Sequence, residues 1–365
     1  MNKKRVLIGM SGGVDSSVAA YILKEQRYEV IGVTMQIWPD LPGQVREKEG
    51  GCCSLSAVDD ARRVANHIGI PFYVMNFKEV FQDKVIDYFI DEYVKGRTPN
   101  PCIACNRHIK FDRFLKKALE LDAFYVATGH YAHIIYDNQK QRYLLKKSAA
   151  VGKDQTYALY SMTQYQLEHT LFPLGQYTKD QVRDIAKKIG LTVANKPDSQ
   201  EICFVDDNDY GKFIEQQLDR EIKPGNFVDT QGNVLGQHKG IIHYTIGQRK
   251  GLGIALGKPM YVVAIDVDNN TVVLGEHHEV FSNQMIVEQI NLISLSSLTE
   301  PRRVKVKIRY TAPEAPAILY PIEDNKIRVV FDEPQRAITP GQAAVFYEDD
   351  YVLGGGIIEC SLNSN

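Results

Sequence analysis

Short apolar runs alternate with longer amphipathic segments over the first two hundred residues of the chain. The apolar runs have the length of buried strands, and between them apolar residues recur at helical spacing. This alternation is typical of a parallel sheet covered by helices, so we predict an α/β domain. A late helix is expected to begin after the N-cap residue Thr178 and to end at Gly190. The predicted strands cover residues 6–10, 30–35, 72–76 and 124–127, and the other predicted helices cover 17–26, 54–68, 78–95 and 107–121.

The pattern changes at about Asp209, where Gly, Asn and Asp turn residues begin to separate β-rich runs. The strings NFVDTQGNVLG and MYVVAIDVDNNTVVLGE each predict two strands joined by a polar turn. Further strands are predicted over residues 303–310, 326–331 and 342–347. We therefore divide the chain into an α/β domain over 1–205, a small mixed connector domain over 206–280 and a C-terminal barrel or sandwich over 281–365.

Composition narrows the class of protein. A chain of 365 residues that is 44% hydrophobic and 24% charged is expected to fold into two or three globular domains. We find neither a secretory signal nor a run of about 18 apolar residues, so a cytoplasmic location and no membrane partner are expected. Six cysteines are too few for a disulfide scaffold. The net charge of −2 means that nucleic-acid binding would require a local basic surface.

A glycine-rich loop follows the first predicted strand. The strand RVLIGM runs directly into SGGVDSS, which places the loop at the edge of the sheet where α/β folds bind ligands. Gly12 and Gly13 let backbone N–H groups approach a phosphate, while Ser11, Ser16 and Ser17 add hydroxyl donors beside a helix N-terminus. A glycine turn with a serine cap that binds nothing is the alternative. The loop lacks a GK[ST] ending, which argues against transfer of a γ-phosphate.

Two cysteines lie in the string GRTPNPCIACNRHIKF. Because Pro99 and Pro101 disfavour helix in the residues before them, we expect Cys102 and Cys105 on an exposed, stiff loop. Residues 95–117 carry seven Lys or Arg and one acidic residue, which would stabilise a nucleophilic thiolate. No second CxxC is present and neighbouring Cys52 and Cys53 rarely converge on one ion, so no zinc or other metal site is predicted. Cys203 by itself reads as an ordinary buried thiol.

These motifs, taken together, resemble the tRNA-specific 2-thiouridylase family along essentially the whole chain. The resemblance implies a pyrophosphate-loop ATPase domain with a parallel sheet, a small mixed connector domain and a C-terminal β-barrel. It also implies an enzyme that uses ATP and Mg²⁺ to convert the wobble uridine (position 34) of tRNA into 2-thiouridine, AMP and pyrophosphate. The matching strings are SGGVDSS, GRTPNPCIACN, ATGHYA, KDQTYALY, DSQEICF, HYTIGQRKGLG, TPGQAAVFY and GGGII.

The same resemblance assigns roles to single residues. Cys105 matches the catalytic nucleophile, and Cys203 matches the cysteine that carries sulfur as a persulfide. The residues matching ATP contacts are Gly9, Met10, Ser11, Gly12, Gly13, Val14, Asp15, Ser16, Met35 and Gly129. Those matching contacts with the tRNA or its target base are Asn100, Pro101, Cys102, His130, Lys153, Asp154, Gln155, Arg309, Tyr310 and Gln342. The implied partners are tRNAs for Lys, Glu and Gln and a persulfide donor, either a cysteine desulfurase or a sulfur-relay protein.

One position departs from the family pattern. Some members carry an acid where this chain has Cys102, and that acid has been considered a general base, a role that Cys102 does not inherit. Cys102, Cys105 and Cys203 could together hold an iron–sulfur cluster. We favour a spectator Cys102, because a cluster would occupy the thiol that persulfide chemistry requires.

Alternating charge marks a second basic segment. In RRVKVKIRY, strand geometry predicts Arg303, Lys305, Lys307 and Arg309 on one face and Val304, Val306, Ile308 and Tyr310 on the other. Such a row of cations suits RNA, although a solvated barrel face is the more common outcome. Two alternatives to a thiolase remain: a pyrophosphate-loop amide ligase or synthetase, and a non-catalytic RNA-binding protein that holds ATP as a structural ligand.

Overall fold

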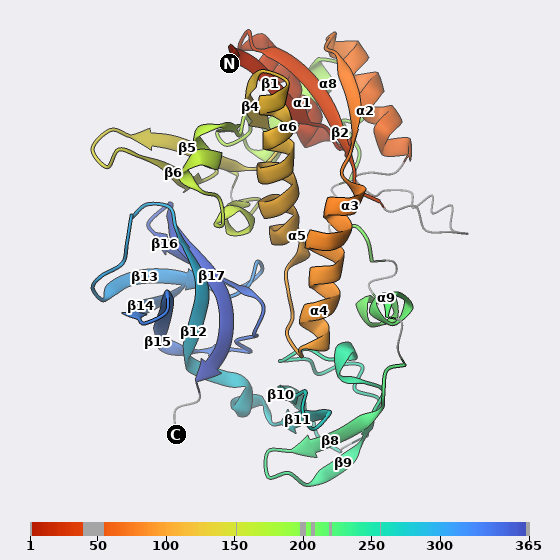
Figure 1. Ribbon diagram of the computed structural model, residues 1–365, viewed down its shortest axis with the longest axis vertical. Coiled ribbons are helices and arrows are strands. Elements are labelled where there is room, and N and C mark those ends of the chain that lie inside the picture. Colours follow the sequence, from red (N-terminus) through yellow and green to blue (C-terminus); the bar gives the residue numbers. More distant parts are fainter. Residues whose placement is uncertain are drawn as a thin grey trace. The chain divides into compact units, whose positions relative to one another are not determined.

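The computed structural model describes residues 2–38, 55–150, 152–197, 202–205, 209–218, 221–255 and 257–362 (Figure 1). Cys52 and Cys53, for which the sequence predicts no metal site, lie outside these residues. The chain forms two compact units. The first contains Met1–Ile86, Cys102–Phe204 and Asp350–Val352, and the second contains Asp87–Pro101, Val205–Asp349 and Leu353–Asn365.

A five-stranded parallel sheet organises the first unit, in the order β3-β2-β1-β4-β7. Because β2 and β4 pair with opposite sides of β1, the strand order reverses between β1 and β4, and α/β sheets form their ligand crevice at such a point. The four predicted strands are confirmed. The strands are β1 (Asn2–Gly9), β2 (Glu29–Gln36), β3 (Phe72–Asn76), β4 (Ala123–Ala127) and β7 (Thr170–Leu171).

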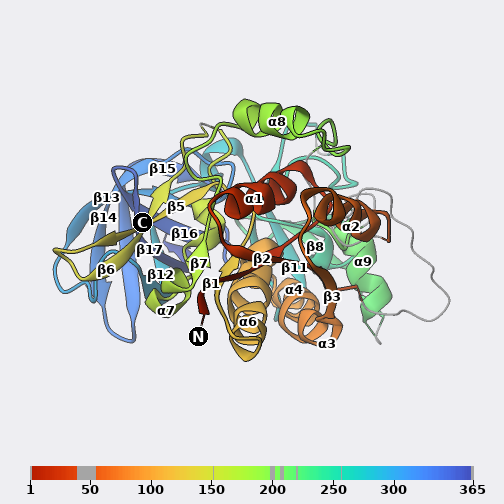
Figure 2. The same ribbon diagram turned by 90° about the horizontal axis from the view of Figure 1, so that it is seen from above.

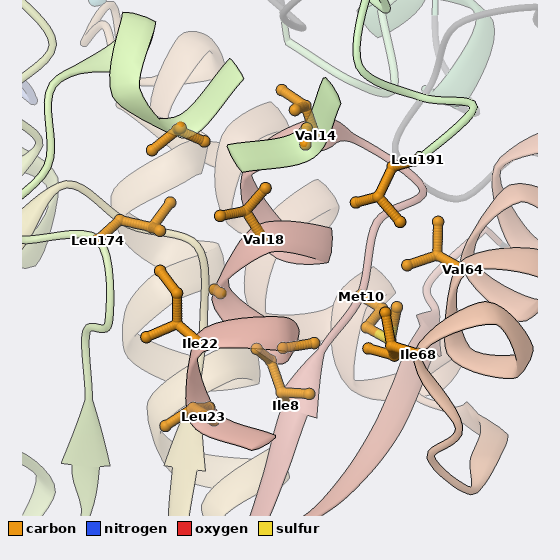
Figure 3. Close-up of a cluster of buried hydrophobic side chains, with 14 of the residues drawn as sticks. Ile8, Met10, Val14, Val18, Ile22, Leu23, Val64, Ile68, Leu174 and Leu191 are labelled. Atoms are coloured by element: carbon orange, nitrogen blue, oxygen red, sulfur yellow. The ribbon is translucent and has the colours of Figure 1, made fainter. Parts of the chain in front are cut away.

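Helices cover both faces of this sheet, as the alternating pattern predicts. Figure 2 shows α1 (Val14–Glu25), α2 (Leu55–Ile68) and α8 (Lys179–Lys188) on one face, with α3 (Lys78–Phe81) and α6 (Phe114–Glu120) on the other. Helices α1, α2 and α8 pack their apolar side chains over β1 (Figure 3). Labelled members of that core are Ile8, Met10, Val14, Val18, Ile22, Leu23, Val64, Ile68, Leu174 and Leu191.

The two central helices differ from their prediction. The predicted helix over 78–95 is broken into α3, the π-helix η1 (Gln82–Asp87) and α4 (Tyr88–Val94). The predicted helix over 107–121 begins earlier, as α5 (Pro101–Ala104), and continues through the π-helix η2 (Cys105–Arg113) into α6. The expectation of a loop for Cys102 and Cys105 is therefore wrong. Pro101 occupies the first helical position, where its missing N–H costs nothing and its fixed φ favours a helix start.

A hairpin and two short helices complete the first unit. Strands β5 (Ala132–Asp137) and β6 (Arg142–Lys147) pair in antiparallel register. The 3₁₀ helix η3 (Thr156–Leu159) and α7 (Gln164–Glu168) follow, and a capping box at Thr163 begins α7. The helix predicted after Thr178 is confirmed as α8, and Thr178 caps it through a second capping box with Gln181.

The second unit contains a small mixed sheet and a barrel. The two predicted hairpins are confirmed as β8 (Gly225–Asp229) with β9 (Val234–His238) and β10 (Tyr261–Asp266) with β11 (Thr271–Gly275), and β11 pairs with β8 in parallel. The helix α9 (Tyr210–Gln217) packs Phe213 against Phe89 of α4. The remaining elements of this part are the 3₁₀ helices η4 (Ile241–His243) and η5 (His277–Val280).

The C-terminal strands close on themselves. Six strands follow one another in the order β12-β15-β14-β13-β16-β17, and β12 also pairs with β17. A buried core of aliphatic and Phe side chains fills the interior. The strands are β12 (Phe281–Leu292), β13 (Arg302–Lys307), β14 (Ala315–Ile322), β15 (Lys326–Arg336), β16 (Ala343–Glu348) and β17 (Tyr351–Leu362).

Candidate active site

The glycine-rich loop lies between β1 and α1, and hydrogen bonds within the loop fix its shape. The Ser16 hydroxyl accepts from the Ser11 N–H at 3.2 Å and donates to the Gly13 carbonyl at 3.2 Å. Ser17 is fully buried and its hydroxyl donates to the same carbonyl at 2.8 Å. The expectation that Ser17 offers its hydroxyl to a ligand is therefore wrong. Ser17 instead stabilises the first turn of α1, whose leading N–H groups have no partner within the helix.

Two positions require glycine, because other segments of the backbone approach them closely. Gly12 has φ +68°, and a Cβ there would lie 2.3 Å from the Ala57 carbonyl oxygen of α2. Gly129, two residues after β4, would place a Cβ 2.7 Å from the Ser16 nitrogen. The turn after β4 thus lies directly against the start of α1. This contact brings Gly129 beside Asp15 and Ser16, three residues that the sequence assigns to one ligand.

The floor of the loop comes from β1 and β2. Met10 donates its N–H to the Val33 carbonyl at 2.8 Å and accepts at its own carbonyl from the Thr34 hydroxyl at 2.8 Å. The Met35 side chain passes over Gly9, where a Cβ would lie 3.0 Å from Met35 Cε. The predicted residues Gly9, Met10 and Met35 therefore lie together at the carboxyl ends of the two central strands.

An ion pair lies at the start of α1. Both carboxylate oxygens of Asp15 accept from the Lys179 ammonium, each at 2.8 Å, and Oδ1 also accepts from the Tyr131 hydroxyl at 2.7 Å. A second lysine, Lys196, contacts the other flank of the loop. Its ammonium donates to Asp60 of α2 at 2.9 Å and to the Gly12 carbonyl at 3.3 Å.

Tyr131, Lys179 and Lys196 were not predicted from the sequence. One signal was available for Lys179, because a cation at the first position of a helix opposes the helix dipole and requires a compensating anion. Tyr131 follows His130 in the quoted string ATGHYA, yet the family resemblance gives it no role.

The segment Lys153–Asp154–Gln155, predicted to contact tRNA, is hydrogen-bonded to neighbouring residues of the first unit. The Asp154 carboxylate accepts from the Ser148 N–H at 3.1 Å and from the Thr156 hydroxyl at 2.5 Å. The Gln155 N–H donates to the Tyr131 carbonyl at 3.0 Å, and Gln155 Oε1 accepts from the Tyr131 N–H at 2.9 Å. Asp154 and Gln155 thus shape the segment, and their assignment as RNA contacts stays a prediction.

His130 is packed between aromatic rings. Its ring centroid lies 5.9 Å from that of Phe111 and 5.8 Å from that of Phe172, and its Nδ1 lies 2.6 Å from the Thr128 hydroxyl. Burial, reinforced by the nearby Lys110 ammonium, holds the pKa of His130 well below its usual value. A neutral imidazole at this position can form hydrogen bonds with RNA, but it offers no positive charge to a phosphate.

The two predicted sulfur-handling cysteines belong to the first unit and are both partly exposed, whereas Cys102 is exposed. Cys105 is the first residue of η2, and π-helical turns are frequent at functional sites. The next residue, Asn106, is 3% exposed and donates to the Ala158 carbonyl at 2.9 Å. Phe204 fixes the neighbourhood of Cys203, because its buried ring packs edge-on against Phe81 at 5.9 Å.

In the second unit the segment before Asn100 is held to the barrel. Gln342 donates from its side-chain amide to the Thr98 carbonyl at 2.8 Å, and the Thr98 N–H donates to the Pro340 carbonyl at 2.8 Å. Arg97 donates to Glu92 at 2.8 Å and to Glu288 at 2.9 Å. The described contacts of Gln342 therefore position the segment that leads to Asn100 and Pro101, and its tRNA contact stays a prediction.

The predicted alternation along β13 is confirmed, because Val304 and Val306 are buried while Arg303 and Lys305 are exposed. Tyr310 departs from it: β13 ends at Lys307, and Tyr310 is 44% exposed beyond the strand instead of joining the apolar face. Its ring lies 5.7 Å from the Lys307 ammonium. Arg309 donates from Nη2 to the carbonyls of Arg336 and Ala337, at 2.6 and 3.0 Å.

Two general observations complete the site. Within the described residues, no helix has the length and apolar character needed to cross a membrane. The same residues contain no group of three or more His, Cys, Asp or Glu side chains that could hold a metal ion.

The parallel sheet, its glycine loop and the two following β-domains define a class: a pyrophosphate-loop ATPase domain joined to a mixed domain and a barrel. Residues 4–207 match the model described as "tRNA methyl transferase HUP domain". Residues 211–276 match "tRNA methyl transferase PRC-barrel domain", and residues 282–358 match "Aminomethyltransferase beta-barrel domain". Our exact domain boundaries stay a prediction.

Relatives identify the family within this class. The chain is 68% identical to the tRNA-specific 2-thiouridylase MnmA of Acetivibrio thermocellus, over 98% of this chain and 100% of that protein. It is 63% identical to the tRNA-specific 2-thiouridylase MnmA of Clostridioides difficile, over 99% of each chain. The chain therefore belongs to the tRNA-specific 2-thiouridylase family. Among solved structures, NMN synthetase from Francisella tularensis is similar at a TM-score of 0.35 and 15% identity, over 54% of this chain and 67% of that one.

Proposed function

We propose that this protein catalyses the ATP-dependent 2-thiolation of the wobble uridine (position 34) of tRNA. The observation that carries the proposal is the packing of the glycine-rich loop: Gly12 lies against α2, and Gly129 lies against the first turn of α1. The chain also matches a thiouridylase over 98% of its length. The loop offers an anion site, and Cys105 and Cys203 of the same unit offer sulfur chemistry.

The loop fits the pyrophosphate part of ATP. Gly12 and Gly129 let the loop and the turn after β4 pack closely against α2 and the start of α1. In this arrangement the N–H groups at the start of α1 would bind phosphate oxygens. Met35, whose side chain lies beside Gly9, would flank the adenine. Mg²⁺ is usually held by one or two carboxylates together with substrate phosphates, and Asp15 would be the protein ligand. Bound Mg²⁺ would supply positive charge for the departing pyrophosphate.

Adenylation makes the uracil C2 oxygen a leaving group. In the proposed first step this oxygen attacks the α-phosphorus of ATP, the bond to the β-phosphate oxygen breaks, and pyrophosphate leaves. The N–H groups of the loop stabilise the charge that develops on the departing group. Displacement at C2 then expels AMP instead of oxide.

Sulfur reaches C2 from a persulfide on Cys203, by one of two routes. In one route the Cys105 thiolate attacks the Cys203 sulfur, forming a disulfide and releasing hydrosulfide, which displaces AMP. In the other route the terminal persulfide sulfur displaces AMP first, and Cys105 then cleaves the sulfur–sulfur bond. Both routes oxidise two thiols to a Cys105–Cys203 disulfide, which a dithiol reductant must reopen.

RNA recognition in this proposal involves residues of both units. The basic segment after Asn100, His130 and Lys153–Gln155 would contact the tRNA, and so would Arg309, Tyr310 and Gln342 of the second unit. The acceptors proposed are tRNAs for Lys, Glu and Gln. The persulfide on Cys203 would come from a cysteine desulfurase or a sulfur-relay protein, and the protein would act in the cytoplasm.

Nucleoside mass spectrometry of tRNA incubated with the protein, ATP and a persulfide donor tests this function. We expect Cys105→Ala and Cys203→Ser each to abolish 2-thiouridine while ATP binding is retained, because neither thiol belongs to the loop. Cys360→Ser is the matched control: Cys360 lies on β17, and burial together with Glu359 raises the pKa of its thiol. Thiolated product from either catalytic variant above background would refute the two-cysteine mechanism. An amide ligase would be favoured instead if Cys105→Ala kept full ATP-dependent pyrophosphate release and neither it nor the wild type formed 2-thiouridine.

The role of Cys102 has its own test. We propose that it is a spectator with respect to cluster chemistry, so anaerobically purified protein should contain no stoichiometric iron. Iron analysis with visible absorption measures this directly. Stoichiometric iron that is lost in Cys102→Ala, together with activity, would replace the persulfide route by a cluster route.

A further inference from the structure

The ion pair between Asp15 and Lys179 is partly buried beside the glycine-rich loop. The side chain of Lys179 is 12% exposed and that of Asp15 is 28% exposed. Both carboxylate oxygens lie 2.8 Å from the same ammonium. Both charges are partly shielded from solvent, so salt screens their attraction less than it screens an exposed pair.

The placement of Lys179 is also unfavourable locally. It is the first residue of α8, directly after the cap Thr178, where the helix dipole repels a cation. Asp15 offsets that repulsion. Its own position in the first turn of α1 is favourable, because the dipole of that helix attracts an anion there. The Tyr131 hydroxyl fixes Oδ1 from a third element, so the carboxylate has a defined orientation. The fold therefore holds an ammonium at the mouth of an anion-binding loop.

We propose that Lys179 is a nucleotide-binding residue whose ammonium neutralises the pyrophosphate part of ATP, with Asp15 as its counter-ion while the loop is empty. This inference rests on the proposed function and adds a residue to its site. With phosphates and Mg²⁺ in the loop, Asp15 would hold the metal and Lys179 would donate to a phosphate oxygen. Lysine suits such an exchange, because its charge is compact and its four-carbon stem is flexible.

Lys196 shows why the assignment falls on Lys179. Lys196 donates to the Gly12 carbonyl, which is part of the loop's own backbone, and to Asp60 of α2. These contacts tie the loop to α2, so the role of Lys196 is to maintain loop shape. Lys179 instead contacts the Asp15 carboxylate, which the incoming metal would engage.

Equilibrium binding of ATP, inorganic pyrophosphate and AMP, each measured with Mg²⁺ by calorimetry, tests the proposal on the full chain. In Lys179→Met we expect affinity for ATP and for pyrophosphate to fall about tenfold or more, the usual effect of losing a charge-assisted contact. Affinity for AMP should match that of the wild type, because AMP lacks the pyrophosphate. Lys179→Gln keeps a hydrogen-bonding group toward Asp15 and is the second variant if the Met form does not fold.

Lys188→Met is the matched control, because Lys188 is an exposed lysine of the same helix. It should bind all three ligands as the wild type does. Unchanged ATP affinity in both Lys179 variants would overturn the proposal. Equal loss of ATP and AMP affinity would also overturn it, since that result indicates a collapsed loop. Wild-type protein that binds no ATP would refute the proposed function instead.

Discussion

The phosphate loop and strand β13 are both sequence signals for polyanion binding, yet they depend on different atoms. The loop presents backbone N–H groups, and its Ser16 and Ser17 hydroxyls donate to the loop's own Gly13 carbonyl. Strand β13 presents side-chain charge, and part of that charge is already neutralised. Arg303 pairs with Asp332 of β15, and Arg302 pairs with Glu348 of β16.

The two surfaces therefore differ in how substitutions weaken their binding of a polyanion. A backbone site is destroyed by a single methyl group placed where two chain segments touch. A charged strand loses affinity gradually, in proportion to the cations that are removed, and its exposed ion pairs contribute little. Predictions that separate the two cases therefore differ in the size of the effect as well as in the residue changed.

The largest effect should come from Gly12→Ala. The new Cβ would lie 2.3 Å from the Ala57 carbonyl oxygen at a φ of +68°, so the loop must deform. We expect pyrophosphate release to fall by about 100-fold or more, comparable with the loss of a preorganised donor group. Release measured with tRNA and ATP gives the rate directly.

Gly13→Ala provides the internal comparison. Its Cβ would lie 3.5 Å from the Ser11 hydroxyl oxygen, an ordinary contact, and its backbone is extended. We expect a clearly smaller loss than for Gly12→Ala, although the motif treats the two glycines alike. Equal losses would show that the close approach of α2 is not what restricts the loop.

An intermediate effect is expected from replacing Lys305, Lys307 and Arg309 together by Ala. Each lost phosphate contact should lower the salt dependence of tRNA binding by about one unit of logarithmic slope. The neutral double variant Arg303→Ala/Asp332→Ala removes a cation together with its partner and should leave the slope unchanged. Binding titrations over a range of salt concentrations distinguish them. A triple variant with the wild-type slope would return β13 to a solvated barrel face.

The smallest effect concerns His130 and pH. Its pKa is lowered in the folded state by burial first and by Lys110 second, so the unfolded chain binds the proton more tightly. Stability is therefore full above the unfolded pKa of about 6.5 and falls as the pH drops below it. Urea unfolding between pH 7.5 and 5.5 should show a shallower loss in His130→Asn than in the wild type. Parallel curves would mean that His130 does not contribute.

Much of this architecture follows from local sequence. Apolar runs predicted four of the five strands of the first sheet, all but the two-residue β7, and paired β-runs with polar turns predicted both connector hairpins. The helices around the cysteines were harder, because a π-helical turn adds a residue and shifts the phase of the apolar positions that follow it. Pro101 also reads as a helix breaker unless it is known to occupy the first helical position.

The site was predictable where a role belongs to a motif, and less so where it depends on distant partners. The residues of the glycine-rich loop and Gly129 lie together in the structure. Each group is matched to ATP contacts through a single string, SGGVDSS for the loop and ATGHYA for Gly129. Lys179 lies 164 positions after Asp15, and only the fold shows that they touch. The family strings likewise mark Gln342, but they do not reveal that its amide bonds to the Thr98 carbonyl.

Tyr131 connects the phosphate loop with the segment predicted to contact RNA, and this connection has a thermodynamic consequence. Its backbone is bonded twice to Gln155, in the segment predicted to contact RNA, and its hydroxyl is bonded to Asp15 at the phosphate loop. Two ligands that bias one shared element are linked, and such linkage is reciprocal by necessity. Whatever factor tRNA applies to the affinity for ATP through Tyr131, ATP must apply to the affinity for tRNA. A closed cycle of four dissociation constants, measured for the wild type and for Tyr131→Phe, would give the size of that factor.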